Sequence, residues 1–425
     1  MIDSAKSPKA LNCEGFLFSK EEELSLAWFC YQSDCKLEAL LLLDTLLSRH
    51  PCCAQAYYIS SLCYQSLGDF NKAEEHCLLA LECEPLFPEA LNALGEIQYA
   101  QNAHPDIFLE SFRKASELSP GLVNPIVNIG NYYWRQGDVG GAIVYYNKAI
   151  EASPSSYEGF YNYGRALQQQ GRLDEAINLY SQALSLKEGH VDSLWNTSIC
   201  YLLKGDYSRG WNLYDYRLRL ASGSALHAEP ALPLWRGERE SIQVEQGILL
   251  VSEQGLGDTI QFCRYAKLLE DQGLNVRLCV QPQLHSLIVA SGLNSSPILP
   301  KDCSIYRDGL WLPLLSLPGI LGVSPDNVIS SAPYVKPLKS HVFKWKKLLD
   351  VEAKPVVGIH WQGNHVLEAT NESFQGRSIP LESFRPLLKY NDIKLLSLQK
   401  GYGSEQRLSC SFAGQFVGCQ ELIDQ

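Results

Sequence analysis

Residues 128–154 read NIGNYYWRQGDVGGAIVYYNKAIEASP, and this stretch decides the fold of the first half of the chain. Small and apolar residues recur at helical spacing on two successive helices, which we call A and B. They are Ile129, Gly130 and Tyr133 on helix A, and Ala142, Tyr146 and Ala149 on helix B. Gly130 and Ala142 are small enough for the two helices to approach closely. Pro154 ends helix B because proline cannot continue a helix.

The same pattern recurs with a period close to 34 residues. Gly137, Gly171 and Gly205 follow one another at this spacing. One position of helix A is marked by Tyr57, Leu91, Ile126, Phe160 and Leu194, at intervals of 34, 35, 34 and 34 residues. The extra residue fits an altered turn at 103–105. A fixed period of this length indicates a solenoid of helix-turn-helix units.

This pattern resembles the tetratricopeptide repeat (TPR). Six units start near residues 21, 54, 88, 123, 157 and 191, with the first degenerate and the last drifting at Gly210 and Arg217. We therefore predict an N-terminal tail at residues 1–19 and an α-helical TPR solenoid at residues 20–224. The resemblance implies a superhelix whose A helices line a groove that holds a protein segment or peptide.

Four asparagines fall on the predicted A helices: Asn128, Asn131, Asn162 and Asn196. An Asn side chain can both donate to and accept from the backbone of an extended peptide. The alternative interpretation is that these side chains only solvate the inner face of the solenoid. The sequence does not distinguish between the two.

Composition narrows the classes of partner. The formal net charge of −11 argues against a general binder of nucleic acid or anionic membranes. Residues 1–15 lack the features of a signal peptide, and no apolar run approaches the length of a membrane span, so we expect a cytoplasmic protein. The 14 cysteines include no Cys-x-x-Cys pair, and Cys30, Cys63, Cys77 and Cys200 fall on apolar repeat positions. We expect reduced thiols and no metal site.

The helical period fails after Leu220, and residues 221–233 have the small-residue and proline content of a linker. Beyond it, buried strands are predicted at 247–252, 275–280, 355–361 and 393–399, with a short strand near Ile298. Helices are predicted at 259–271, 283–290 and 381–390. Alternating strands and helices indicate a doubly wound α/β sheet.

A glycine-rich turn, Ser252-Glu-Gln-Gly-Leu-Gly-Asp258, follows the first of these strands. Ligands of such sheets bind beyond the carboxyl ends of the strands, which makes this turn a candidate site. Gly255 and Gly257 permit a tight turn. The turn lacks both the Gly-Lys-Ser/Thr ending of a P-loop and the third glycine of a dinucleotide fingerprint. From position alone, Asp258 is an N-cap or an acid in the first helical turn.

Residues 253–265, EQGLGDTIQFCRY, resemble the opening of bacterial repeat-fused glycosyltransferases that are similar to ADP-heptose:lipopolysaccharide heptosyltransferases. The resemblance extends to LWRG at 234–237, HWQGN at 360–364, RSIPL at 377–381 and SLQKG at 397–401. It implies a GT-B fold with Rossmann-like lobes, metal-independent transfer, and a nucleotide-sugar as donor substrate without a further cofactor. Residues 225–345 would form a linker and the acceptor-side lobe, and residues 346–425 a partial nucleotide-side lobe.

The resemblance also implies roles for individual residues. Asp258 matches a general base that removes a proton from the hydroxyl of a glycan or protein acceptor. The acceptor loop would comprise Glu253, Gln254, Gly255 and Gly257. The nucleotide would contact Gln362, Gly363, Asn364, Arg377 and Lys400. The alternative for Arg377 is a solvated loop charge.

The second lobe is short for this family, because only about 75 residues follow Val351 and the later donor-phosphate segment is missing. We therefore expect little or no sugar transfer by these residues alone. Two alternatives remain at this stage. One is a non-catalytic TPR scaffold, and the other is an enzyme resembling protein O-linked N-acetylglucosamine transferases.

Overall fold

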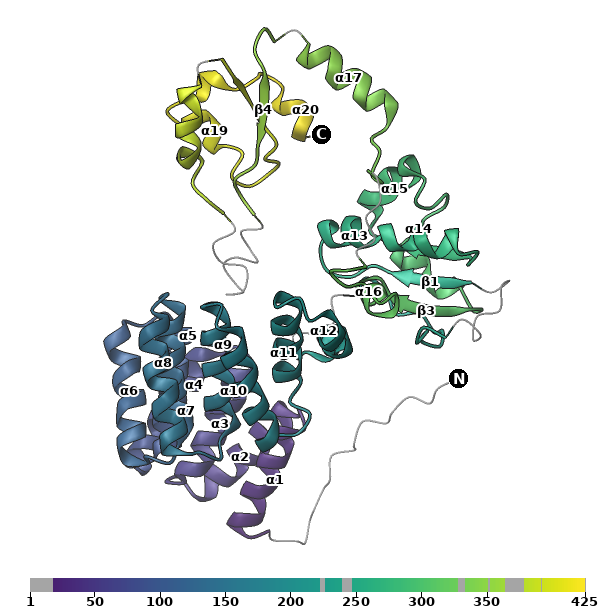
Figure 1. Ribbon diagram of the computed structural model, residues 1–425. Helices are drawn as coiled ribbons and strands as arrows, with labels where there is room; N and C mark the ends of the chain where they lie inside the picture. Colours follow the sequence, from purple (N-terminus) through teal and green to yellow (C-terminus); the bar gives the residue numbers. More distant parts are fainter. Residues whose placement is uncertain are drawn as a thin grey trace. The chain divides into compact units, whose positions relative to one another are not determined.

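The computed structural model describes residues 18–221, 226–238, 247–327, 333–350, 352–363, 378–390 and 392–424. The chain divides into two compact units, Met1–Ala221 and Ser222–Gln425. The first unit contains an array of paired helices, and the second contains two small parallel sheets (Figure 1).

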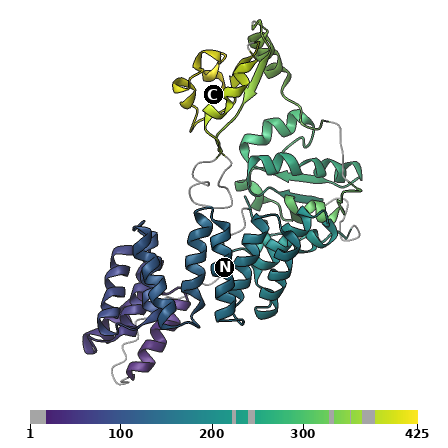
Figure 2. The same cartoon turned by 60° about the vertical axis from the view of Figure 1, so that its left-hand side comes forward.

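The array confirms the predicted TPR solenoid. Its A helices are α1 (Lys20–Gln32), α3 (Ala54–Ser66), α5 (Pro88–Ala100), α7 (Val123–Arg135), α9 (Tyr157–Gln169) and α11 (Val191–Leu203). Its B helices are α2 (Lys36–Arg49), α4 (Phe70–Cys83), α6 (Pro105–Leu118), α8 (Val139–Ala152), α10 (Leu173–Leu186) and α12 (Tyr207–Tyr214). Each helix packs against the one before it and the one after it (Figure 2). A short 3-10 helix, η1 (Asp215–Arg219), ends the array.

Two residues after the end of each A helix, the backbone adopts the left-handed conformation. Gly137, Gly171 and Gly205 have φ of 80°, 75° and 81°. The earlier units place Asp34, Gly68 and Asn102 at the same turn, with φ of 66°, 79° and 59°. Asp and Asn tolerate this conformation better than other residues with a Cβ. The extra residue of the third unit falls between Asn102 and Pro105, in the predicted turn.

The helices of a unit approach closely because a glycine on helix A faces a ring on helix B. A Cβ added to Gly130 would lie 2.6 Å from Tyr146 Cε1. The same pairing joins Gly95 to Phe112 at 2.6 Å and Gly164 to Tyr180 at 2.7 Å. Burying these rings against a neighbouring backbone fills the space between helices without voids. The predicted close approach at Gly130 is therefore confirmed.

The first sheet of the second unit is parallel, with strand order β2-β1-β3. These strands are β1 (Ile248–Val251), β2 (Val276–Cys279) and β3 (Leu310–Pro313). Ile248 pairs with both Val276 and Leu310, and every residue of β1 is buried. Single parallel bridges join Cys279 to Ile298 and Leu234 to Trp311. The predicted strand near Ile298 is thus one bridge, and β3 was not predicted.

Two further expectations for this region were wrong. The predicted helix 259–271 is divided at Cys263 into α13 (Leu256–Phe262) and α14 (Arg264–Asp271). Residues 226–233 of the predicted linker 221–233 pack against the sheet instead, where Leu232 is buried and Leu226 pairs with Glu253. The other helices of this region are η3 (Pro282–Leu284), α15 (His285–Ser291), η4 (Pro300–Ile305), η5 (Leu314–Ser316) and α16 (Leu317–Ile320).

The second sheet has two parallel strands, β4 (Val356–Ile359) and β5 (Lys394–Ser397). A small core of Ile359, Trp361, Leu381, Leu395, Phe412 and Phe416 packs against it. The predicted helix at 381–390 is the 3-10 helix η7 (Leu381–Lys389), which contains Pro386. The remaining helices are α17 (Lys339–Leu349), α19 (Gln406–Ser409), η8 (Ala413–Gln415) and α20 (Gln420–Asp424). Within the described ranges, no helix has the length and apolar character that crossing a membrane requires.

Candidate functional site

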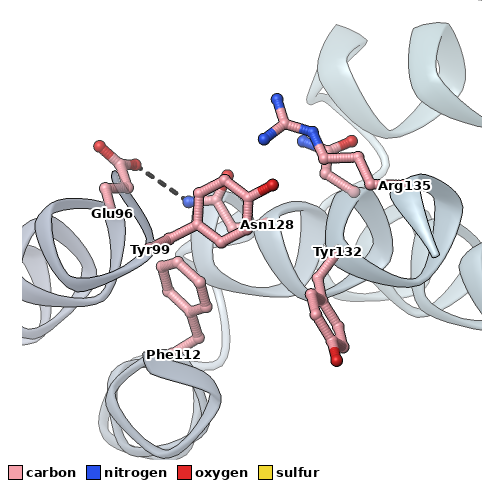
Figure 3. A pocket seen from close by; sticks show the side chains of 7 residues that line it. Glu96, Tyr99, Phe112, Asn128, Tyr132 and Arg135 are labelled. Atoms are coloured by element: carbon pink, nitrogen blue, oxygen red, sulfur yellow. Dashed lines mark hydrogen bonds between the residues drawn. The ribbon is translucent and has the colours of Figure 1, made fainter. Parts of the chain in front are cut away.

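A pocket of about 180 Å³ opens on the A-helix side of the third and fourth TPR units (Figure 3). Most of its lining comes from α5 and α7, and one ring comes from α6. The lining residues are Glu96, Tyr99, Phe112, Asn128, Asn131, Tyr132 and Arg135. The pocket therefore presents a carboxylate, a guanidinium, two amides and three aromatic rings to a ligand.

Hydrogen bonds between neighbouring units fix the wall of this pocket. Asn128 Nδ2 donates to Asn92 Oδ1 at 3.0 Å and to Glu96 Oε1 at 2.9 Å. Asn92 Nδ2 donates to the same Glu96 oxygen at 2.8 Å. The Arg135 guanidinium lies over the Tyr99 ring, 4.9 Å from its centre. Because both contacts join α5 to α7, the polar groups of the pocket are held in place before any ligand binds.

The four asparagines predicted on A helices occupy different environments. Asn128 and Asn131 line the pocket, and Asn131 Oδ1 accepts a hydrogen bond of 2.8 Å from the Tyr146 hydroxyl. Asn162 is buried and donates to the Glu158 carbonyl at 3.0 Å. Asn196 Nδ2 donates to the Tyr161 hydroxyl at 3.5 Å. Each asparagine thus also supports the array itself, which the sequence pattern did not indicate.

Sequence reasoning did not single out Glu96, Tyr99 or Arg135, although all three lie on A helices. A signal for them was present. Glu96 and Asn131 occupy the same position of successive A helices, 35 residues apart, as do Tyr99 and Trp134. Aligning the units position by position would have found the residues that share the pocket side.

In the second unit, the glycine-rich turn lies at the carboxyl end of β1, the central strand of its sheet. Its left-handed residue is Gln254, with φ of 60°, whereas Gly255 has φ of −85°. A Cβ added to Gly257 would meet no atom within 4 Å. Neither glycine therefore adopts a backbone conformation that requires glycine, and the role of Gly255 and Gly257 in a close approach to a ligand stays a prediction.

Asp258 is the third residue of α13 and is partly exposed. Its Oδ2 accepts a hydrogen bond of 3.0 Å from the backbone N–H of Gly255, the N-cap residue. A carboxylate at this position satisfies an N–H that the helix leaves without an internal partner. This contact matches the first-turn interpretation of Asp258.

Glu253 is 1% exposed, and its Oε1 accepts a hydrogen bond of 3.2 Å from the backbone N–H of Leu315 in η5. This carboxylate therefore anchors the turn to the segment that follows β3. Gln254, Gly255 and Gly257 are exposed. Within the predicted acceptor loop, the Glu253 side chain is therefore buried and hydrogen-bonded, whereas Gln254, Gly255 and Gly257 are exposed to solvent.

A buried polar network lies next to the turn and was not predicted. His227 Nδ1 is 2.9 Å from Ser252 Oγ. Thr259 Oγ1 donates to Gln281 Oε1 at 2.9 Å, and Gln281 Nε2 is 3.5 Å from His227 Nε2. Sequence reasoning missed it because His227 belongs to the stretch interpreted as a linker. The network fixes the carboxyl ends of β1 and β2 relative to the start of α13.

In the second sheet, two of the predicted nucleotide contacts lie at the end of β4. Gln362 N–H donates to Gln399 Oε1 at 3.0 Å, and Gly363 N–H donates to Ser378 Oγ at 2.8 Å. Lys400 follows β5 and is exposed. Asn364 and Arg377 lie outside the described residues. The structure therefore gives geometry for Gln362, Gly363 and Lys400 only.

The buried cysteines of the array are poor nucleophiles. Burial raises the pKa of the Cys63 thiol to about 11 and the pKa values of the Cys77 and Cys200 thiols to about 12. The thiolate is the form that reacts or binds metal, so these side chains act as small apolar core residues. Among the described residues, no three His, Cys, Asp or Glu side chains are grouped to hold a metal ion.

Comparisons with known proteins support the array. Tetratricopeptide-repeat sequence profiles match residues 54–85, 127–191 and 161–225. No curated protein sequence matches the chain. Among solved structures, PilW, a type IV pilus biogenesis factor, is 21% identical, with 47% of this chain and 92% of PilW covered and a TM-score of 0.41.

Two other solved structures share a similar sequence identity with the chain. PilF of Pseudomonas aeruginosa is 18% identical, with 48% of this chain and 93% of PilF covered and a TM-score of 0.41. YrrB, a TPR protein with an unusual peptide-binding site, is 19% identical, with 41% and 90% covered and a TM-score of 0.31. Residues 20–214 are thus a TPR array, on the evidence of the profiles and the helix pairs.

Proposed function

We propose that the chain is a protein-interaction scaffold whose TPR array binds an extended segment of a partner protein along its A helices. The pocket between α5 and α7 carries this proposal. It combines aromatic rings, which supply apolar contact area, with Asn128, Asn131 and Glu96, which can pair with backbone groups. Extended segments expose backbone N–H and C=O groups that need such partners when water is displaced.

The rigidity of the pocket supports the same function. Asn128 and Glu96 are already hydrogen-bonded across two units, so a ligand need not order them. Preorganised groups bind more tightly because less side-chain entropy is lost on binding. The network also leaves capacity for a ligand, since a carboxylate has about four acceptor positions and Glu96 Oε1 accepts from two amides.

A phage-displayed random peptide library, selected on the full chain, tests the proposal. We expect enriched peptides whose binding falls about tenfold in Asn128→Ala, because a hydrogen bond to a ligand backbone and the α5–α7 link are both lost. Asn147→Ala is the matched control, because Asn147 lies exposed on α8, outside the pocket. Failure to enrich any peptide, or equal loss in both variants, would rule out this pocket.

A second candidate function is sugar transfer by the second unit, from a nucleotide-sugar to a hydroxyl acceptor with Asp258 as general base. The observation that favours it is position: Asp258 lies in the first turn of the helix that follows β1, and parallel sheets bind ligands at this edge. The nucleotide would contact the β4 end near Gln362 and Gly363. Arg377 and Lys400 would supply positive charge to its phosphates.

The substitution Asp258→Asn separates catalysis from capping. An Asn Oδ1 can still accept the Gly255 N–H, so the melting temperature should stay the same, but an amide cannot take a proton from a hydroxyl. A general base is worth roughly 100-fold or more, so transfer from the nucleotide-sugar should fall by that factor. Transfer that is unchanged in the variant would remove Asp258 as the general base.

A further inference from the structure

A second and larger groove lies on the A-helix side at the N-terminal end of the array. Its volume is about 480 Å³. Helices α1 and α3 and the start of α5 line it, through Glu21, Leu24, Ser25, Trp28, Gln55, Tyr58, Ile59, Phe87 and Glu89. The floor is apolar and aromatic, and the Tyr58 and Phe87 rings lie 5.1 Å apart between their centres. Trp28 is 37% exposed, so the groove offers one open aromatic wall.

Two carboxylates at this groove differ from the other acids of the first three A helices. Glu22 is used in the N-terminal cap of α1, Glu23 pairs with Arg49, and Glu96 accepts from Asn92 and Asn128. Glu21 and Glu89 are exposed, and within residues 18–221 no hydrogen bond or ion pair reaches either carboxylate. The groove therefore joins apolar surface to two exposed carboxylates.

The negative charge of the array is concentrated in its first three units, which contain this groove. Residues 18–118, the first three units, carry 16 Asp and Glu against 6 Lys and Arg. Residues 119–221, the last three units, carry nine of each. Burial is the main cause of the raised pKa of the Tyr58 phenol, and the nearby Glu89 and Glu96 carboxylates raise it further. The first three units therefore carry excess negative charge, and two carboxylates lie close enough to Tyr58 to affect its phenol.

These features specify the chemistry of an occupant. A neutral or acidic segment that covered the groove would remove water from the Glu21 and Glu89 carboxylates and give them no new hydrogen-bond or ionic partner. Burying an unpaired charge in this way costs free energy. A Lys or Arg beside an apolar side chain would instead pair with a carboxylate, and its cation could also lie against the faces of the aromatic rings. We propose that the first three TPR units bind a basic, apolar peptide segment of a partner protein, with cationic side chains between Glu21 and Glu89.

This inference rests on the proposed function, because it names the ligand class of the same A-helix side. Three fluorescein-labelled nonapeptides test it on the full chain: they share Leu and Phe at alternating positions and differ in carrying Lys, Gln or Glu between them. We expect fluorescence anisotropy to show tightest binding for the Lys peptide and weakest for the Glu peptide. Raising salt should weaken the Lys peptide most, because exposed charge pairs are screened.

The double variant Glu21→Gln and Glu89→Gln should weaken the Lys peptide by about fivefold and leave the Gln peptide unchanged, as expected for two partly exposed ion pairs. The control Glu75→Gln and Glu82→Gln removes the same charge from exposed positions on α4, outside the groove. It should leave the preference for Lys intact. Melting curves of both variants should match wild type.

Three outcomes overturn the inference. A Gln peptide that binds as tightly as the Lys peptide would leave peptide binding in place but remove the charge selection. Equal weakening by the two double variants would show that net charge acts at a distance, without a defined groove. Absence of binding by all three peptides would remove the groove as a site. The effect of Asn128→Ala on the library peptides is a separate result, because it tests only the pocket between α5 and α7.

Discussion

Gly130 sits where helix A passes closest to helix B, and Tyr146 leaves no room for a side chain there. A Cβ at Gly130 would also lie 2.9 Å from Tyr146 Cδ1 and 3.3 Å from Tyr145 Cβ. The Tyr146 ring is fully buried and hydrogen-bonded to Asn131, so it cannot rotate away without losing that bond. The cost of a substitution should therefore come from overpacking.

We predict that Gly130→Ala destabilises the array by about 1–3 kcal/mol, as extra methyl groups do in packed cores. Urea unfolding followed by circular dichroism measures this change. Gly121→Ala is the control, because a Cβ at Gly121 would meet no atom within 4 Å. Equal stability of the two variants would mean that the helices can separate at this point at little cost.

His76 makes the array sensitive to pH. Its Nδ1 is buried without a hydrogen-bond partner among the described residues, and its ring packs against Tyr57 and Tyr64. Burial lowers the pKa of His76 below its ordinary value of about 6.5. The folded state therefore holds the neutral ring, and the unfolded state takes up a proton first as the pH falls.

We predict that the array loses stability as the pH is lowered through about 6.5, because protonation of His76 then favours the unfolded chain. His76→Phe keeps an aromatic ring but cannot titrate, so its stability should fall less between pH 7 and pH 5.5. Urea midpoints at the two pH values measure the difference. Burial also lowers the pKa of His190, so the stability of His76→Phe should still fall somewhat as the pH is lowered. An unchanged slope in His76→Phe would contradict this explanation.

At the scale of elements, periodicity predicted every helix pair of the array, whereas in the second unit the apolar runs predicted β1, β2, β4 and β5 but not β3. The repeat pattern recurs in every unit, so it predicts where each A helix begins. These helices begin at Ala54, Pro88, Val123, Tyr157 and Val191. In the second unit each element occurs once. β3 is only four residues long and ends in Pro313, a residue that is disfavoured in strands, so its pairing with β1 identifies it.

The segment 221–233 was misread as a linker for a related reason. Its prolines and small residues are typical of linkers, but Leu232 is buried, and the Pro233 carbonyl accepts a hydrogen bond of 3.0 Å from the Trp311 backbone N–H. Long-range contacts of this kind leave no local signal. The same holds at the candidate sites, where Asn128 was found from its helix position but its link to Glu96 was not.

We predict that Trp235→Ala destabilises the second unit by about 3–5 kcal/mol, the range for removing a buried Trp. The helical signal of the first unit should keep its melting temperature, because Trp235 lies in the other compact unit. Differential scanning calorimetry of the full chain separates the two transitions. A shift of the helical transition by the same amount would show that the units unfold together.

At the scale of the molecule, the array is held together by contacts within each unit and between neighbouring units. Each pair of helices packs on the next, and the last buried glycine, Gly210, packs against Leu202 of the same unit. The stability of repeat arrays is close to a sum of such neighbour terms. The division of the chain after Ala221 agrees with this dependence.

We predict that residues 18–221 fold when expressed alone and give a helical circular dichroism spectrum with a cooperative melt. Their melting temperature should match that of the helical transition in the full chain to within a few degrees. A shorter piece that ends at Leu118 is the comparison, since it loses the neighbour contacts of the last three units and should melt lower. A mostly disordered 18–221 fragment would contradict the neighbour-only account.

Photo-crosslinking tests most directly the claim that the array binds a partner segment along its A helices. A peptide selected on the full chain, with benzoylphenylalanine in place of one apolar residue, is irradiated in the complex, and the joined sites are identified by mass spectrometry. We predict crosslinks on α1, α3, α5 and α7, at residues such as Trp28, Tyr58 and Tyr99 that line the two A-helix pockets. Crosslinks confined to B helices, such as α4 and α8, or to the second unit would contradict the claim.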